Sequence, residues 1–119
     1  MLLISLLFVC HFLGDFTPLS TTWMQEAKQF GKPLFPILIH ALIHASLMLF
    51  VLFFFTTVQM AFTLSAFQLI IHFFVDTWKG RMNTWFPSLQ NNANKEYWII
   101  FGFDQFLHQM TILVMAFYL

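Results

Sequence analysis

Four long apolar segments occupy most of this chain, and they restrict the folds that it can adopt. They lie at about residues 2–19, 34–56, 60–78 and 98–119. A helix needs roughly 20 apolar residues to cross the hydrocarbon core of a membrane. Of the 119 residues, 60% are hydrophobic and only 8% are charged, a composition too apolar for an ordinary soluble domain. The sequence therefore predicts an all-α integral membrane bundle of four transmembrane helices, forming a single transmembrane domain over residues 1–119.

The connections between the segments differ in character. Only a few residues around 57–59 separate the second segment from the third, which predicts a tight antiparallel hairpin. Residues 21–30 mix apolar and charged side chains, a pattern typical of a short helix lying on the membrane surface. The first segment is the least regular, because Gly14 and Asp15 interrupt its apolar run. It lacks the basic residues and cleavage motif of a signal peptide, so we interpret it as a retained span.

The basic residues indicate how the bundle lies in the membrane. All five occur in two connections: Lys28, Lys32, Lys79, Arg81 and Lys95. Because positive charge is enriched in cytoplasmic loops, both connections are predicted to be cytoplasmic. The N- and C-termini then lie on the non-cytoplasmic side of a multi-pass protein, with the cell inner (plasma) membrane as the expected location.

A single spacing accounts for every histidine and aspartate in the chain. They form four pairs, each with its members four residues apart: His11 with Asp15, His40 with His44, His72 with Asp76, and Asp104 with His108. Residues i and i+4 share one face of a helix. Since each pair lies in or beside a different apolar segment, four helices can direct all eight groups toward one centre.

The predicted helix directions sort these groups by depth. All four pairs fall in the cytoplasmic half of the bundle, and within each pair one residue lies deeper in the membrane. The deeper layer contains His11, His44, His72 and His108. The other layer, about 6 Å nearer the cytoplasm at ~1.5 Å of rise per residue, contains Asp15, His40, Asp76 and Asp104.

Ionisable groups inside a bilayer are costly, and they usually face a partner within the bundle. Imidazoles and carboxylates together suit a divalent metal ion such as Zn, Mn or Fe, as one ion or as two that share ligands. The candidate metal ligands are His11, His40, His44, His72, His108, Asp15, Asp76 and Asp104. The candidate catalytic residues are Asp15, Asp76, Asp104 and Lys79. Interhelical hydrogen bonding explains any single pair equally well, but it does not require every pair to lie at one depth.

Three functions agree with this pattern. The first is a metal-dependent hydrolase of a lipid or amphiphilic phosphate, in which an unligated aspartate is the general base and Lys79 and Arg81 meet the anionic head group. The second is a proton or metal-cation transporter or relay, which would need an oligomer. The third is an accessory subunit of a larger membrane complex, for example one that binds a pigment. The expected partners are the lipid bilayer and an amphiphilic substrate, and no nucleic acid.

The motifs around these pairs resemble a known family over nearly the whole chain. They are His11-Phe12-Leu13-Gly14-Asp15-Phe16 followed by Trp23-Met24 and Lys28, then His40, then His72-Phe73-Phe74-Val75-Asp76 with Lys79, and finally Asp104-Gln105-Phe106-Leu107-His108. The family is that of small bacterial inner-membrane proteins described as domain of unknown function 3307. Its pattern has a glutamine where this chain reads Thr17-Pro18-Leu19. The resemblance implies membership, but no activity comes with it.

Overall fold

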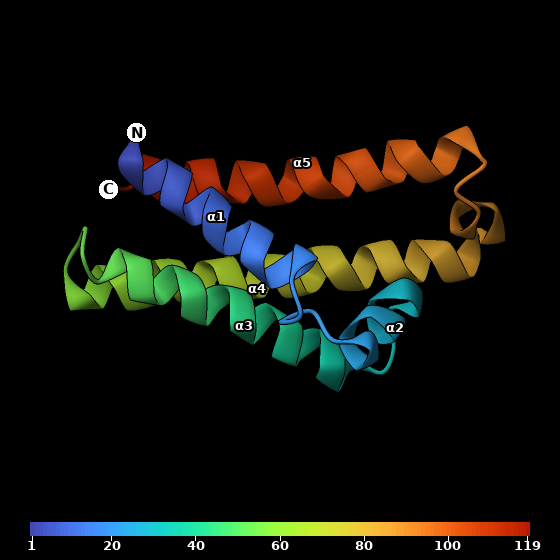
Figure 1. Ribbon diagram of the computed structural model, residues 1–119, viewed down its shortest axis with the longest axis horizontal. Helices are drawn as coiled ribbons and strands as arrows, with labels where there is room; N and C mark the ends of the chain where they lie inside the picture. The colour runs from blue at the N-terminus through green and yellow to red at the C-terminus, as the bar shows by residue number, and fades with distance from the viewer.

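The computed structural model describes residues 1–119 and is entirely helical, which confirms the all-α prediction. The elements are α1 (Leu2–Phe16), α2 (Thr22–Phe30), α3 (Leu34–Leu52), α4 (Val58–Trp85), the 3-10 helix η1 (Pro87–Gln90) and α5 (Lys95–Phe117). Figure 1 shows α3, α4 and α5 following the long axis of the molecule, with α1 inclined across them. Both termini and the α3–α4 turn lie at one end, whereas α2 and η1 lie at the other.

Three of these helices are long and apolar enough to cross a membrane. They are α3 with 19 residues, α4 with 28 and α5 with 23. α1 is apolar but has only 15 residues, because it ends at Phe16 rather than at the predicted residue 19. Thr17 leaves the helix with an extended backbone (φ −123°, ψ 174°), as expected for a residue that precedes proline. The fold therefore fits a membrane protein with three candidate spans and one shorter apolar helix.

The other predicted boundaries also shift. α3 ends at Leu52 rather than at residue 56, and α4 begins at Val58, where the Thr57 side chain accepts a hydrogen bond from the backbone of Met60. α4 then continues past residue 78 to Trp85, and α5 starts at Lys95 rather than at residue 98. Hydropathy marks where a helix leaves the apolar region of the sequence, not where its backbone hydrogen bonds stop. The extra turns of α4 provide the surface on which α2 and η1 pack.

α2 is a capped helix held tightly against α4. The Thr21 side chain accepts a hydrogen bond from the backbone of Met24, and Gly31 ends the helix in the left-handed conformation (φ 68°). A methyl group on Gly80 of α4 would overlap the backbone nitrogen of Gly31. This close approach and the buried side chains of Met24 and Ala27 fix the face of α2 that is turned toward the bundle.

The interior has an apolar part and a polar part. The apolar core consists of Leu7, Cys10, Met48, Leu52, Ala61, Leu64, Ile112 and Met115. The outer surface carries exposed aromatic side chains such as Phe12, Phe54 and Phe74, as expected of a surface that faces lipid. The polar part of the interior holds the histidines and aspartates.

Candidate metal centre

Four imidazoles, one each from α1, α3, α4 and α5, form a compact cluster. The ring centroids of His44 and His72 are 4.0 Å apart, and those of His72 and His108 are 4.2 Å apart. The His11 ring lies 5.1 Å from the rings of both His44 and His108. These are the four side chains that the helix directions place in one layer. His40 lies one turn away, with its ring centroid 4.7 Å from that of His44.

Asp15 joins α1 to α3 through this cluster. Its Oδ1 atom lies 3.0 Å from Nε2 of His40 and 3.0 Å from Nε2 of His44. Its Oδ2 atom lies 3.2 Å from Nε2 of His11, which precedes it by one turn. A methyl group on Gly14 would overlap the His44 ring, so a residue without a side chain allows α1 to approach α3 here.

Asp76 has the corresponding role between α4 and α5. Its Oδ2 atom lies 3.0 Å from Nε2 of His72, and its Oδ1 atom lies 3.1 Å from Nε2 of His108. Oδ1 of Asp104 lies 3.4 Å from the same His108 nitrogen. Every histidine of the chain thus directs Nε2 toward a carboxylate, and all eight side chains predicted from the sequence meet in one cluster.

Within the cluster, two sets of side chains have metal-ligand geometry. The first is Asp15, His40, His44 and His72, and the second is His72, Asp76 and His108; in each set the ligand atoms lie within 4.8 Å of one another. His72 belongs to both sets. Both His40 and His44 are included, so the structure does not require a choice between them.

Two predicted ligands fall outside these sets. His11 directs Nε2 to Asp15 and, at 3.3 Å, to Oε1 of Gln105. Asp104 accepts a hydrogen bond from the Gln105 amide at 3.1 Å. Gln105 therefore links the two outer residues and belongs to the polar shell of the centre. Cys10, although next to His11, donates its thiol to the Leu47 carbonyl at 3.5 Å and points away from the cluster.

The residues present fit a divalent cation. Nε2 of His72, Oδ2 of Asp76 and Oδ1 of Asp104 are buried and have no hydrogen-bond partner of suitable geometry, although ion-pair contacts reach all three. Buried polar atoms are rarely left without a partner. Three aspartate carboxylates lie beside the ammonium groups of two lysines. When the imidazoles are neutral, the cluster therefore carries one net negative charge. Mixed imidazole and carboxylate ligands suit Zn, Mn or Fe.

The end of the cluster that faces the chain termini is closed. One helical turn beyond the four imidazoles, each of α1, α3, α4 and α5 places a buried side chain. These side chains are Leu7, Met48, Gln68 and Ile112, all no more than 3% exposed. The amide nitrogen of Gln68 lies 3.1 Å from Nδ1 of His72. The polar centre therefore rests on a mostly apolar layer and has no opening at this end.

Lys28 is a member of the site that the i, i+4 pattern did not reveal. Its ammonium lies 3.1 Å from Nε2 of His40, 3.5 Å from Oδ1 of Asp15 and 3.8 Å from Oδ2 of Asp76. Burial lowers the pKa of Lys28, but the carboxylates of Asp76, Asp15 and Asp104 together outweigh burial, and the net pKa lies above its ordinary value. Lys28 therefore stays charged and partly neutralises the centre.

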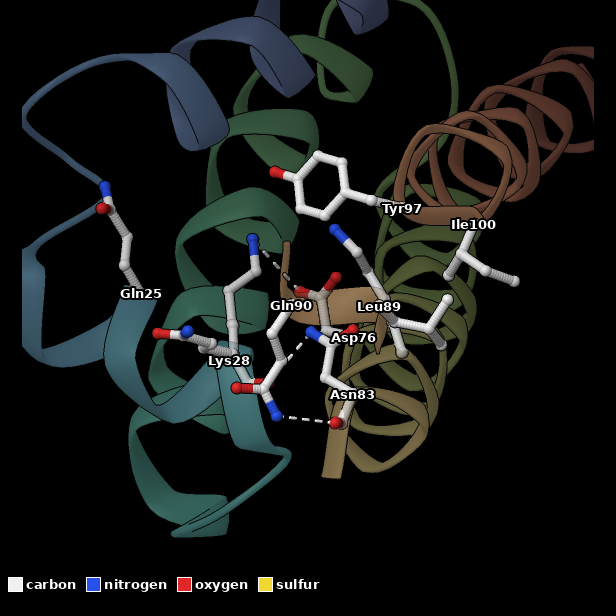
Figure 2. Close-up of a pocket in the computed structure, with 10 residues that line it drawn as sticks. Gln25, Lys28, Asp76, Asn83, Leu89, Gln90, Tyr97 and Ile100 are labelled. Atoms are coloured by element: carbon white, nitrogen blue, oxygen red, sulfur yellow. Dashed lines mark hydrogen bonds and ion pairs between the residues drawn. The ribbon is translucent and has the colours of Figure 1, made fainter. Parts of the chain in front are cut away.

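A cavity of about 360 Å³ leads from the α2 and η1 end of the bundle to the cluster. Figure 2 shows Asp76 at this cavity, with Lys28 on one side of it. Lys79 also lines the cavity and lies 3.7 Å from Oδ2 of Asp104. The remaining polar lining consists of Gln25, Gln29, Asn83, Gln90 and Tyr97. Lys28 thus supplies the second positive charge of the cavity. Arg81, which was expected to meet the head group together with Lys79, is not among the lining residues, and its backbone packs near Gly31.

Together, the fold and the site define a class: a small all-α protein with an apolar exterior and a buried histidine–aspartate cluster suited to a metal ion. The sequence matches the family described as "Protein of unknown function (DUF3307)" over residues 2–119. The chain belongs to this family, as the resemblance of its motifs indicated. No curated protein and no solved structure matches it.

Proposed function

We propose that this protein is a membrane-embedded, metal-dependent hydrolase that cleaves the phosphate ester of a lipid or amphiphilic phosphate at the cytoplasmic membrane surface. One observation carries the proposal: the cavity combines two lysines with Asp76 of the candidate metal centre. Lysines bind phosphate, and a metal beside the bound phosphate suits ester hydrolysis. A cavity of about 360 Å³ is within the usual size range of small-molecule sites.

The proposed placement has four spans, both termini on the non-cytoplasmic side, and a location in the inner (plasma) membrane. The positions of Lys28, Lys32, Lys79, Arg81 and Lys95, in or beside α2 and η1, support the cytoplasmic assignment of that end. The 15 residues of α1 rise only about 22 Å, less than the ~30 Å hydrocarbon core. Local thinning of the bilayer around a short span accommodates such a difference at modest cost.

Three residues of the chain have separate roles in the proposed reaction. A bound divalent ion would polarise a phosphoryl oxygen and lower the pKa of a water molecule. Lys28 and Lys79 hold the phosphate in the cavity. Asp104, which lies outside both ligand sets and whose Oδ1 atom lies 3.4 Å from Nε2 of His108, accepts a proton from the attacking water. The water oxygen bonds to phosphorus, the bond from phosphorus to the ester oxygen breaks, and the departing alcohol takes a proton from solvent in the cavity.

The closed end of the centre favours hydrolysis over transport. A transporter or proton relay needs a path to the opposite side, and the buried layer of Leu7, Met48 and Ile112 lies across that path. Pigment ligation in an accessory subunit would need a histidine with room for a large ring. Every imidazole here has another imidazole within about 5.1 Å, centroid to centroid.

The test is phosphate release from dodecyl phosphate and phosphatidic acid by protein reconstituted in phosphatidylcholine vesicles with Zn, Mn or Fe. We expect metal-dependent release, reduced about 10²–10⁴-fold in Asp104→Asn, the range typical of a lost general base. Glu26→Gln removes an exposed carboxylate of α2 outside the cavity and should retain full activity. Failure of all three metals to support release by the folded protein would contradict the proposal.

A further inference from the structure

An apolar groove continues from the polar cavity toward the outside of the bundle. It has a volume of about 320 Å³ and is lined by Met82, Phe86, Ser88, Leu89, Glu96, Ile99 and Ile100. Leu89 and Ile100 line both the groove and the polar cavity. In Figure 2 these two side chains lie together on the side of the cavity away from Gln25 and Lys28.

We infer that this groove holds the hydrocarbon chain of the substrate while the polar cavity holds its phosphate, so that the ligand is an alkyl or acyl phosphate lying between α4, η1 and α5. The inference rests on the proposed function for its substrate class. The two halves of the site match the two halves of such a molecule: Lys28 and Lys79 face the anionic head, and mostly apolar side chains face the chain. The passage at Leu89 and Ile100 joins them.

A second apolar groove provides the comparison that the inference needs. It has a volume of about 360 Å³ and is lined by Leu19, Ile39, Leu42, Ile43, Ser46, Leu47 and Phe50. None of these residues lines the polar cavity. Both grooves are apolar enough to take up lipid chains of the bilayer, but only the first is continuous with the two lysines. Selective binding of a phosphate-bearing chain is therefore expected in the first groove alone.

Each groove contains one serine, which allows a matched labelling experiment. Ser88→Cys and Ser46→Cys place a thiol in the first and second groove, while the native Cys10 is only 5% exposed and serves as an unreactive background. The rate of maleimide alkylation is measured in phosphatidylcholine nanodiscs with EDTA present, so that no hydrolysis takes place. The probes are dodecyl phosphate, hexyl phosphate, dodecanol and inorganic phosphate.

We expect dodecyl phosphate to slow alkylation of the Ser88→Cys thiol by about tenfold or more, and hexyl phosphate to slow it less, because each buried methylene adds to binding. Inorganic phosphate and dodecanol should give little protection, and Lys79→Gln should remove the protection by dodecyl phosphate. The Ser46→Cys thiol should respond equally to dodecanol and dodecyl phosphate. Equal protection of both thiols, or no protection of the first, would overturn the inference.

A second pair of variants tests the chain site without labelling. Ile99→Trp fills the first groove at an exposed position, and Leu42→Trp fills the second. Ile99→Trp should abolish the preference for dodecyl over hexyl phosphate in binding, and Leu42→Trp should preserve it. If dodecyl phosphate protects the Ser88→Cys thiol from alkylation but no phosphate is released in the presence of metal, the binding site is supported and hydrolysis is rejected. The two proposals can therefore fail separately. An unchanged chain preference in Ile99→Trp would reject the chain site.

Discussion

Gly80 of α4 lies directly against Gly31 at the end of α2, with no room for a side chain between the two backbones. Because Lys28 is one turn from Gly31, this contact sets the position of the ammonium that faces Asp15 and Asp76. The glycine pair therefore connects the packing of the short helix α2 to the charge balance of the buried centre.

Gly80→Ala should separate α2 from α4. The new methyl group would meet backbone atoms, which cannot move aside as a flexible side chain can, so we expect a loss of about 1–3 kcal/mol in the free energy of unfolding. Chemical denaturation in detergent measures this loss. Gly102→Ala is the matched control, because nothing lies within 4 Å of the added methyl group. In a helix this control should be neutral or stabilising by up to about 1 kcal/mol. Equal stability of the two variants would contradict the proposed role of the contact.

Lys28→Gln should destabilise the metal-free protein, because two buried carboxylates lose the cation between them. Removing one partner of a buried ion pair typically costs about 3–5 kcal/mol, and the upper part of that range is not expected for a lysine side chain that is 23% exposed. Thermal unfolding of protein treated with EDTA tests this. Lys32→Gln, which removes an exposed lysine with no ion pair, should have little effect.

The pKa of Lys28 predicts how the effect of Lys28→Gln on stability depends on pH. Since the pKa is raised in the folded protein, the stabilisation by Lys28 is fully present below the ordinary lysine pKa of 10.5 and is lost as the pH rises through the higher folded value. The difference in stability between wild type and Lys28→Gln should thus be constant from pH 7 to about 10 and shrink above that range. A difference that already disappears near neutral pH would contradict this assignment.

Gln68 should determine how well His72 binds metal. Its amide nitrogen lies 3.1 Å from Nδ1 of His72, and its Oε1 atom has no hydrogen-bond partner. If the amide turns so that its Oε1 atom accepts a hydrogen bond from Nδ1–H, Nε2 of His72 keeps its lone pair for a metal ion. Loss of such a supporting hydrogen bond typically lowers metal affinity about 10–100-fold. We expect this reduction for Gln68→Met in a chelator competition experiment, and no change for Gln59→Met at the exposed start of α4. Unchanged affinity in both variants would show that Gln68 only fills space.

The cluster could be predicted from the sequence because the residue spacing that defines it is local. A spacing of four residues fixes a shared helix face, and antiparallel neighbours with pairs near the same depth bring those faces together. The position of Lys28 depends instead on how α2 packs, and that packing depends on the contact between Gly31 and Gly80, which no periodicity reveals. α1 ends early beside Pro18, a residue that hydropathy does not distinguish from the rest of the segment. The extension of α4 to Trp85 runs through polar sequence that hydropathy does not mark as helical.

The central claim is that the cluster holds a divalent metal ion, and elemental analysis tests it most directly. The protein is purified in mild detergent without a histidine tag, supplied in turn with Zn, Mn and Fe, and freed of excess metal. We predict one or two equivalents of metal in wild type and in Glu26→Gln, and a loss in His72→Ala, since His72 belongs to both ligand sets. Asp104→Ala, which lies outside both sets, should lose less, and circular dichroism confirms that each variant is folded. Folded wild-type protein that retains none of the three metals would contradict the account.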